Sequence, residues 1–284
     1  MASTEALVEG PLETGDLDAA CALVSEAGWN QNAADWRIFL ELGSAMSVKT
    51  GDGRLAATAA TLPYPSGFGW ISMVLVTGAF RRRGIATRLL ERCIERLRAA
   101  HSVPVLDATP AGREVYKLLG FRDGWPIQRW RRRADGPLPS SNGTRPLREA
   151  DWPDVLALDA AAFGCDRSPL LERLRQRSAG FSCIFERDGR VRGFLLGREG
   201  RIATQLGPIV ADDEAGAAAL AAHAIRRLPA PIIVDALERH AAFAAWLAAC
   251  GFERERPYTR MALERDALFG DPGATIAIAG PELG

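Results

Sequence analysis

The pattern of apolar and polar residues between residues 70 and 97 predicts a strand followed by a helix. The apolar run Ile71–Val76 is short and rich in β-branched residues, which is typical of a buried strand. Apolar residues then recur with helical spacing, at Ile85, Leu89, Leu90, Cys93, Ile94 and Leu97. The stretch therefore predicts a strand, a loop that contains glycine and arginine, and a long amphipathic helix.

The same two periods predict the other elements of the first half. Residues 1–9 are predicted to be an irregular N-terminal segment, and residues 10–12 are predicted to begin an edge strand. Further predicted elements are helices over 16–27, 33–42 and 113–119, a hairpin over 45–64, and strands over 103–108 and 127–133. Gly51 to Gly53 supply the hairpin turn, and Gly120 ends the third helix.

The pattern restarts after residue 143, which indicates an internal duplication. Pro11-Leu12 is echoed by Pro146-Leu147 and Gly120-Phe121 by Gly251-Phe252, with similar offsets of 146 − 11 = 135 and 252 − 121 = 131. We predict domains over residues 1–133 and 144–284, joined by a linker over 134–143 that is rich in Pro, Ser and Gly. The second half predicts helices over 152–162, 169–177, 215–228 and 241–250, a hairpin over 181–197, and strands over 202–210, 231–236 and 259–263. Residues 275–279 are expected to return as an edge strand.

Composition narrows the possible partners. Lysine plus arginine equals aspartate plus glutamate at 35 each, which argues against a nucleic-acid or membrane partner. We interpret the arginines of residues 129–133 as a solvated strand end rather than a nucleic-acid patch. The five cysteines are scattered and the three histidines lie far apart in sequence, so no metal site is predicted. The absence of a signal peptide or apolar span predicts a cytoplasmic protein.

The loop before the 85–97 helix has the chemistry of an anion site. The first N–H groups of a helix lack intrahelical partners and lie at the positive end of its dipole. Gly84 and Ala86 leave room for close approach, and Arg81 to Arg83 add positive charge. Neither a Walker-type loop nor a Gly-x-Gly-x-x-Gly loop is present, so another kind of pyrophosphate site is predicted.

The pattern Arg81-x-x-Gly84-x-Ala86 resembles the coenzyme A pyrophosphate motif of the GNAT superfamily of acyl-CoA-dependent N-acyltransferases. The resemblance implies that acetyl-CoA places its pyrophosphate on the backbone of residues 83–87 and its pantetheine arm beside Val74 and Val76. The implied coenzyme-binding residues are Val74, Leu75, Val76, Arg81, Arg82, Arg83, Gly84, Ile85, Ala86, Thr87 and Tyr116.

A second motif, Tyr116-Lys-Leu-Leu-Gly120-Phe121, resembles the tyrosine-bearing helix of the same superfamily. The resemblance implies that the Tyr116 hydroxyl protonates the thiolate of coenzyme A as it leaves. Without the upstream loop, a helix tyrosine that packs on the sheet would be the better interpretation. With the loop present, we favour the catalytic role.

The acceptor site is less sharply predicted. By resemblance, the loop between the first two helices forms one wall, which makes Trp29, Asn30 and Gln31 candidates; the alternative is packing by Trp29 and helix capping by Asn30 or Asn32. Trp70 and Ser72 share one face of the central strand, where many GNAT enzymes carry a carboxylate base. The base here stays open between Asp35, Asp107 and a water chain.

The second half lacks both chemical motifs. Asp212, Asp213 and Glu214 stand where the first half has its arginine loop, and Leu247 stands where it has Tyr116. Three carboxylates would repel a pyrophosphate but suit a helix start with no anion bound. We interpret residues 144–284 as a degenerate, non-catalytic GNAT-like domain.

The expected fold class is α/β (α+β), with two GNAT-like domains, each a mixed, mostly antiparallel sheet flanked by helices. The expected activity is acetyl transfer from acetyl-CoA to a primary amine, with a small-molecule acceptor favoured over a protein lysine and a longer acyl group left open. The alternatives are an acetyl-CoA sensor without turnover and an arginine-driven nucleic-acid binder. The sequence does not predict an oligomeric state.

Overall fold

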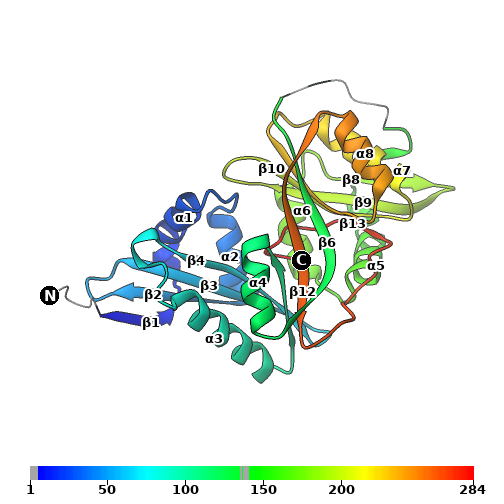
Figure 1. Cartoon of the computed structure of the whole chain (residues 1–284). Helices are drawn as coiled ribbons and strands as arrows, with labels where there is room; N and C mark the ends of the chain where they lie inside the picture. The colour runs from blue at the N-terminus through cyan, green and yellow to red at the C-terminus, as the bar shows by residue number, and fades with distance from the viewer. Residues whose placement is uncertain (1–5, 135, 137–140) are drawn as a thin grey trace. The chain divides into compact units, whose positions relative to one another are not determined.

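The computed structural model describes residues 6–134, 136 and 141–284 (Figure 1). The chain forms two compact units, one up to Pro104 and one from Val105 onward. Of the predicted linker, residues 135 and 137–140 lie outside the described residues. No helix in the described part of the chain is long and apolar enough to cross a membrane.

The first unit is a sheet of antiparallel strands covered on both faces by helices (Figure 1). Its strands, in spatial order, are β1 (Leu7–Pro11), β2 (Ser44–Thr50), β3 (Leu55–Tyr64) and β4 (Phe68–Val76). Helices α1 (Leu17–Glu26) and α2 (Ala33–Leu42) lie on one face, and α3 (Ile85–Ala99) lies on the other. The edge strand begins at Leu7, so the irregular N-terminal segment ends earlier than the predicted residue 9.

Strand β4 contains a β-bulge next to the predicted site. Met73 and Val74 together face Ala59 of β3, and Met73 has a positive φ of 55°. The Thr58 hydroxyl donates a 2.9 Å hydrogen bond to the Met73 carbonyl and so holds the bulge from the neighbouring strand. Bulges bend a strand and redirect its backbone groups.

The second unit is one mixed sheet that uses strands from both halves of the chain. In spatial order its strands are β5 (Val103–Ala108, in this unit from Val105), β12 (Phe252–Leu263), β6 (Phe121–Arg132), β11 (Ile232–Leu237), β13 (Thr275–Ala277), β10 (Thr204–Ala211), β9 (Arg190–Glu199), β8 (Cys183–Arg187) and β7 (Thr144–Pro146). Its helices are α4 (Pro110–Leu118), α5 (Trp152–Phe163), α6 (Ser168–Arg177), α7 (Glu214–Ile225) and α8 (Ala241–Ala249).

The two halves exchange their last long strands. β12 from the second half lies between β5 and β6 of the first, and β6 pairs with β11 of the second. The compact units therefore do not coincide with the predicted domains, because residues 105–132 share a sheet with the second half. The order of the predicted helices and strands is nevertheless the observed one in each half, and the second half adds β7, a short strand that the sequence did not predict.

The arginines of β6 correct one interpretation. Arg129 and Arg132 are 6% and 1% exposed, so they do not belong to the solvated strand end that the sequence predicts. Arg129 makes two 2.8 Å hydrogen bonds to Asp235 on β11, and Arg132 donates to the Cys250 carbonyl at 3.0 Å. Partners from distant sequence make this burial possible, because a buried charge needs a partner.

The strand over residues 275–277 corrects another expectation. β13 is not an edge strand, since it pairs with β10 on one side and with β11 on the other. Its three residues, Thr275, Ile276 and Ala277, are all buried. A three-residue strand with both sides paired is an interior element of the sheet.

Candidate functional site

The loop between β4 and α3 presents the predicted anion-binding groups. Gly84 is the N-cap of α3 with a φ of +74°, a conformation that glycine adopts without strain. Among the described residues, no side chain caps the first turn of α3, and that turn contains no acidic residue. Arg81, Arg82 and Arg83 are exposed beside it. The first turn thus offers free N–H groups, the positive end of a helix dipole and three cations.

Glu26, at the end of α1, holds the start of this loop. Its carboxylate accepts a 2.6 Å hydrogen bond from the Gly78 N–H and a 2.7 Å bond from the Thr77 hydroxyl. It also lies 3.5 Å from the Arg81 guanidinium. These contacts, the Thr77 hydroxyl above all, lower the pKa of Glu26. No sequence pattern indicates Glu26, because the contact joins positions about fifty residues apart.

The predicted coenzyme-binding residues of β4 and the start of α3 include both core and accessible side chains. Val74 and Val76 are half-buried on the same side of β4, as a surface beside a pantetheine arm requires. Leu75 and Ile85 are buried core side chains, so only their backbone groups could meet a ligand. Ala86 and Thr87, in the first turn of α3, are exposed.

Several predicted acceptor residues are buried polar groups. Asn30, Gln31 and Ser72 are 4%, 7% and 9% exposed. Gln31 Oε1 and Ser72 Oγ have no hydrogen-bond partner among the described residues, and neither has the indole nitrogen of Trp36 on α2. An unsatisfied buried polar atom costs about 1–3 kcal/mol, so three in one unit favour a polar ligand or ordered water. Nothing in the sequence pattern singles out Trp36.

The two predicted tryptophans differ in their surroundings. Trp29 is half-buried, at the start of the α1–α2 loop. Trp70 is 2% exposed, and its ring packs edge-on against Tyr64 and Phe68 at centroid distances of 6.2 and 6.4 Å. This enclosure favours a packing role for Trp70.

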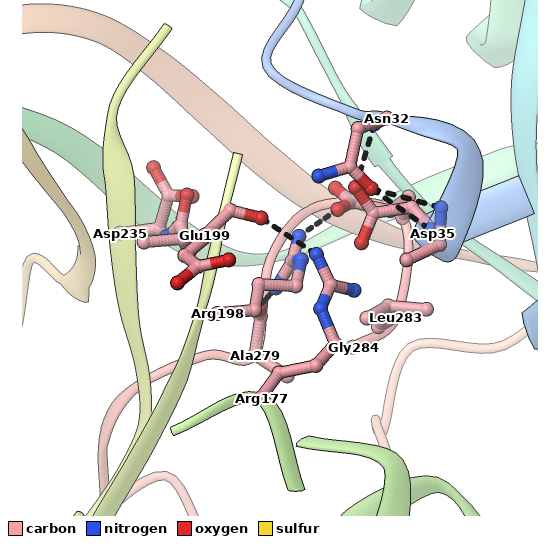
Figure 2. A network of polar contacts seen from close by, with 12 residues as sticks. Asn32, Asp35, Arg177, Arg198, Glu199, Asp235, Ala279, Leu283 and Gly284 are labelled. Carbon is pink, nitrogen blue, oxygen red and sulfur yellow. Dashed lines mark hydrogen bonds and ion pairs between the residues drawn. The ribbon is translucent and has the colours of Figure 1, made fainter. Parts of the chain in front are cut away.

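The carboxylates of both candidate bases, Asp35 and Asp107, make hydrogen bonds within the protein. Asp35 forms a capping box with Asn32 at the start of α2, in which its carboxylate accepts the Asn32 N–H at 2.8 Å (Figure 2). Asp107 makes two 2.9 Å hydrogen bonds to Arg260 on β12. Both oxygens of the Asp107 carboxylate are thus occupied by the Arg260 guanidinium. The water chain is the remaining alternative.

Tyr116 lies on α4 in the second unit and is half-buried. Its ring packs on Phe121 at a centroid distance of 6.0 Å, and a Cβ at Gly112 would lie only 3.0 Å from the ring. Burial raises the pKa of the Tyr116 phenol. The residue therefore combines the packing role with a hydroxyl that keeps its proton at neutral pH, as a general acid must.

Family models match both halves of the chain. Residues 22–121 match the acetyltransferase (GNAT) family, and residues 155–274 match an acetyltransferase (GNAT) domain. The chain contains two GNAT domains. The first GNAT domain holds the arginine loop, and its match extends through Tyr116 to Phe121. The second GNAT domain repeats the order of helices and strands.

Individual relatives agree with this assignment. The "uncharacterized N-acetyltransferase YitH" of Bacillus subtilis is 28% identical over 195 residues, which is 65% of this chain and 66% of that protein. A putative acetyltransferase from Pyrococcus horikoshii has the same fold, with a TM-score of 0.83 at 20% identity, over 100% of this chain and 98% of that one. A tandem GNAT protein from the clavulanic acid biosynthesis pathway has a TM-score of 0.62 at 15% identity, over 90% and 98%.

In the second GNAT domain, the first turn of the corresponding helix, α7, is capped by a carboxylate. Asp213 caps α7 by accepting the Gly216 N–H at 2.7 Å, and it is paired with Arg187 at 2.6 Å. The Glu214 carboxylate accepts the Phe243 N–H at 2.6 Å. Leu247, at the position of Tyr116, is fully buried. Within the described residues there is no group of three or more His, Cys, Asp or Glu that could hold a metal ion.

Proposed function

We propose that the first GNAT domain is an acetyl-CoA-dependent N-acetyltransferase and that the second GNAT domain binds no coenzyme. The observation that supports this most is the uncapped start of α3, which has free N–H groups and three exposed arginines after a bulged strand. Such a site suits a pyrophosphate better than a carboxylate, because it offers several donors and more than one positive charge. The family match favours acetyl-CoA as its source.

The chemistry follows from the residues in place. The acceptor amine attacks the thioester directly, while a backbone N–H near the β4 bulge polarises the carbonyl oxygen. Tyr116 gives its proton to the departing thiolate, and its raised pKa keeps that proton available. Because Asp35 and Asp107 are engaged elsewhere, the amine loses its proton through water.

The acceptor is a small molecule with a primary amine. Gln31 Oε1 and Ser72 Oγ are hydrogen-bonding atoms left unsatisfied in the first unit, which suits a polar acceptor of limited size. A hydroxyl and an amide oxygen can both accept from an ammonium or amine group. An acyl group longer than acetyl would use the same pyrophosphate loop.

Three features support an inactive second domain. Its helix start is capped by Asp213 and carries further carboxylates. Leu247 has no proton to give. The bulge of β10, where Gly207 and Pro208 together face Leu196, puts Pro208 at the position of Val74. Proline has no N–H, so this position cannot polarise a carbonyl.

Calorimetric titration of acetyl-CoA tests this proposal. We expect one site per chain in the wild type and none in an Arg81→Glu, Gly84→Glu variant. Two equivalent sites would contradict the inactive second domain, and the absence of binding would contradict the acetyltransferase.

An acceptor screen then tests turnover. Release of free coenzyme A thiol is followed over a panel of small primary amines, with Tyr116→Phe as the control. Tight acetyl-CoA binding without release for any amine or protein lysine would favour a sensor of acetyl-CoA instead.

A further inference from the structure

The second GNAT domain contains a gap between two parallel strands, and a later part of its own chain fills that gap. β10 and β11 pair directly over three residues, Thr204–Leu206 with Ile232–Val234. Beyond this point β13 runs between them, with Ala277 opposite both Ile209 and Ala236. Because the family match ends at residue 274, the filling segment lies outside the matched part of the domain.

Backbone hydrogen bonds seat the segment on both strands. The Ile278 N–H donates to the Asp235 carbonyl of β11 at 3.0 Å, and the Ala211 N–H of β10 donates to the Ala274 carbonyl at 3.1 Å. Ile276, Ala277 and Ile278 are at most 1% exposed. The segment thus adds a strand and also completes the core around it.

Two buried arginines hold the continuation of the segment. Arg198 on β9 donates to the Ala279 carbonyl (Figure 2). The same guanidinium is paired with Glu282. Arg167, which forms an ion pair with Asp159, donates to the Gly284 carbonyl at 2.9 Å. Residues 275–284, called here the plug segment, are therefore fixed along their whole length.

Strands that diverge leave backbone N–H and C=O groups facing the space between them. Such groups must find partners when they are buried. An extended chain with amide groups at strand spacing can supply them, as in recognition by strand addition. A peptide satisfies this requirement, and so does a pantetheine arm, which carries two amides.

We propose that the gap between β10 and β11 is a binding site for an extended, amide-bearing chain, and that the plug segment occupies it and excludes a pantetheine arm. The identity of the excluded ligand rests on the proposed function of the first GNAT domain. The occupancy itself does not, since it is made entirely within the second unit.

Gly207 is the residue most sensitive to the plug. A Cβ at this position would overlap the Ile278 carbonyl oxygen, which is a backbone atom and cannot move aside alone. Gly207→Ala should therefore push the plug segment out of the gap. Gly251→Ala is a suitable control, because Gly251 also has a positive φ (+80°) but nothing within 4 Å of its Cβ position.

Hydrogen exchange on the full chain tests the proposal, with pantetheine as the probe. In the wild type, the amides of residues 275–279 should exchange slowly and millimolar pantetheine should leave β10 unchanged. In Gly207→Ala, residues 275–279 should exchange at least about tenfold faster, and pantetheine should slow exchange over residues 209–211. The Gly251→Ala control should behave like the wild type.

A second variant, Ile278→Pro, removes the N–H that donates to Asp235 and covers the case in which the strand shifts to accept a methyl group. Equal protection of β10 by pantetheine in the wild type and in the variants would overturn the proposal. So would release of the plug segment without any pantetheine effect, or unchanged exchange of residues 275–279 in both variants. Acetyl-CoA protection of residues 77–87, followed in the same experiment, reports separately on the first GNAT domain.

Discussion

Helices α3 and α7 follow the central strand of the first and second GNAT domains, but their first turns have opposite chemistry. α3 begins at Gly84, without a side-chain cap among the described residues and with arginines before it. α7 begins at Asp213, whose carboxylate accepts the Gly216 N–H, and continues with Glu214. The first turn of α3 is available to an anion, whereas the first turn of α7 is already capped by the Asp213 carboxylate.

This comparison separates fold from chemistry. Both helices follow a bulged central strand, so the fold does not distinguish them. A capping carboxylate stabilises a helix by satisfying an N–H group that a phosphate would otherwise use. The cap that stabilises α7 and the anion binding proposed for α3 therefore use equivalent backbone N–H groups.

The largest expected effect comes from placing a carboxylate at the open helix start. Gly84→Glu should weaken acetyl-CoA binding by at least about 100-fold, because the new charge faces the pyrophosphate and the φ of +74° suits only glycine well. Gly189→Glu is the matched control: its φ is +69°, nothing lies within 4 Å of its Cβ position, and it sits in a hairpin of the second domain. Calorimetry that finds equal losses in both variants would contradict the assigned site.

Tyr116→Phe should lower kcat by about 100-fold and leave the KM for acetyl-CoA nearly unchanged, because the hydroxyl acts on the leaving group. Burial raises the pKa of the Tyr116 phenol above its ordinary value, so wild-type kcat should show no loss from this group near neutral pH. A pH profile with a tyrosine-dependent decline near neutrality would be inconsistent with this role.

Asp213→Ala should lower the free energy of unfolding by about 1 kcal/mol at pH 7, because it removes the cap of α7. Hydrogen bonding, chiefly from Gly216, lowers the pKa of Asp213, so its contribution is present above the ordinary pKa and is lost as the pH falls through the folded value. Urea unfolding at pH 7 and pH 3 measures the difference. Asp212→Ala, a neighbour without a capping bond, should cost less, and acetyl-CoA affinity should stay unchanged in both variants.

The smallest expected effect concerns the anchor of the loop. Glu26→Gln should weaken acetyl-CoA binding by about threefold to tenfold, because the amide keeps at most part of the bonding to Gly78 and Thr77. Glu95→Gln, in an exposed pair with Arg92 on α3, is the control. An affinity in Glu26→Gln equal to that of the control would show that the loop holds its shape without this contact.

Elements with a clear period were predictable from the sequence. All six apolar positions predicted for α3 are buried, and α2 spans the predicted residues 33–42. Strand partners were not predictable, because the alternation along β6 is the same whether its neighbour is β5 or β12. The prediction that residues 275–279 form an edge strand was wrong for the same reason. The sequence of a short apolar strand does not show whether the strand lies at the edge or in the interior of a sheet.

The candidate site shows the same division. The loop and Tyr116 follow from local motifs, because each is a short run of residues with its own chemistry. Glu26 makes contacts that folding creates between distant segments, and no pattern around it indicates them. No pattern indicates Trp36 either, whose indole nitrogen is buried without a hydrogen-bond partner among the described residues. The buried pairs of Arg129 with Asp235 and of Asp107 with Arg260 belong to this second kind.

The exchange of β6 and β12 also bears on how such a protein can change over evolutionary time. β12 lies between β5 and β6, and β6 lies next to β11, so each half of the chain borrows a strand position from the other. A deletion that removed the second GNAT domain would leave β5 and β6 without the strand that lies between them. The duplication is therefore expected to be hard to reverse, because the sheet of the first GNAT domain includes the last long strand of the second.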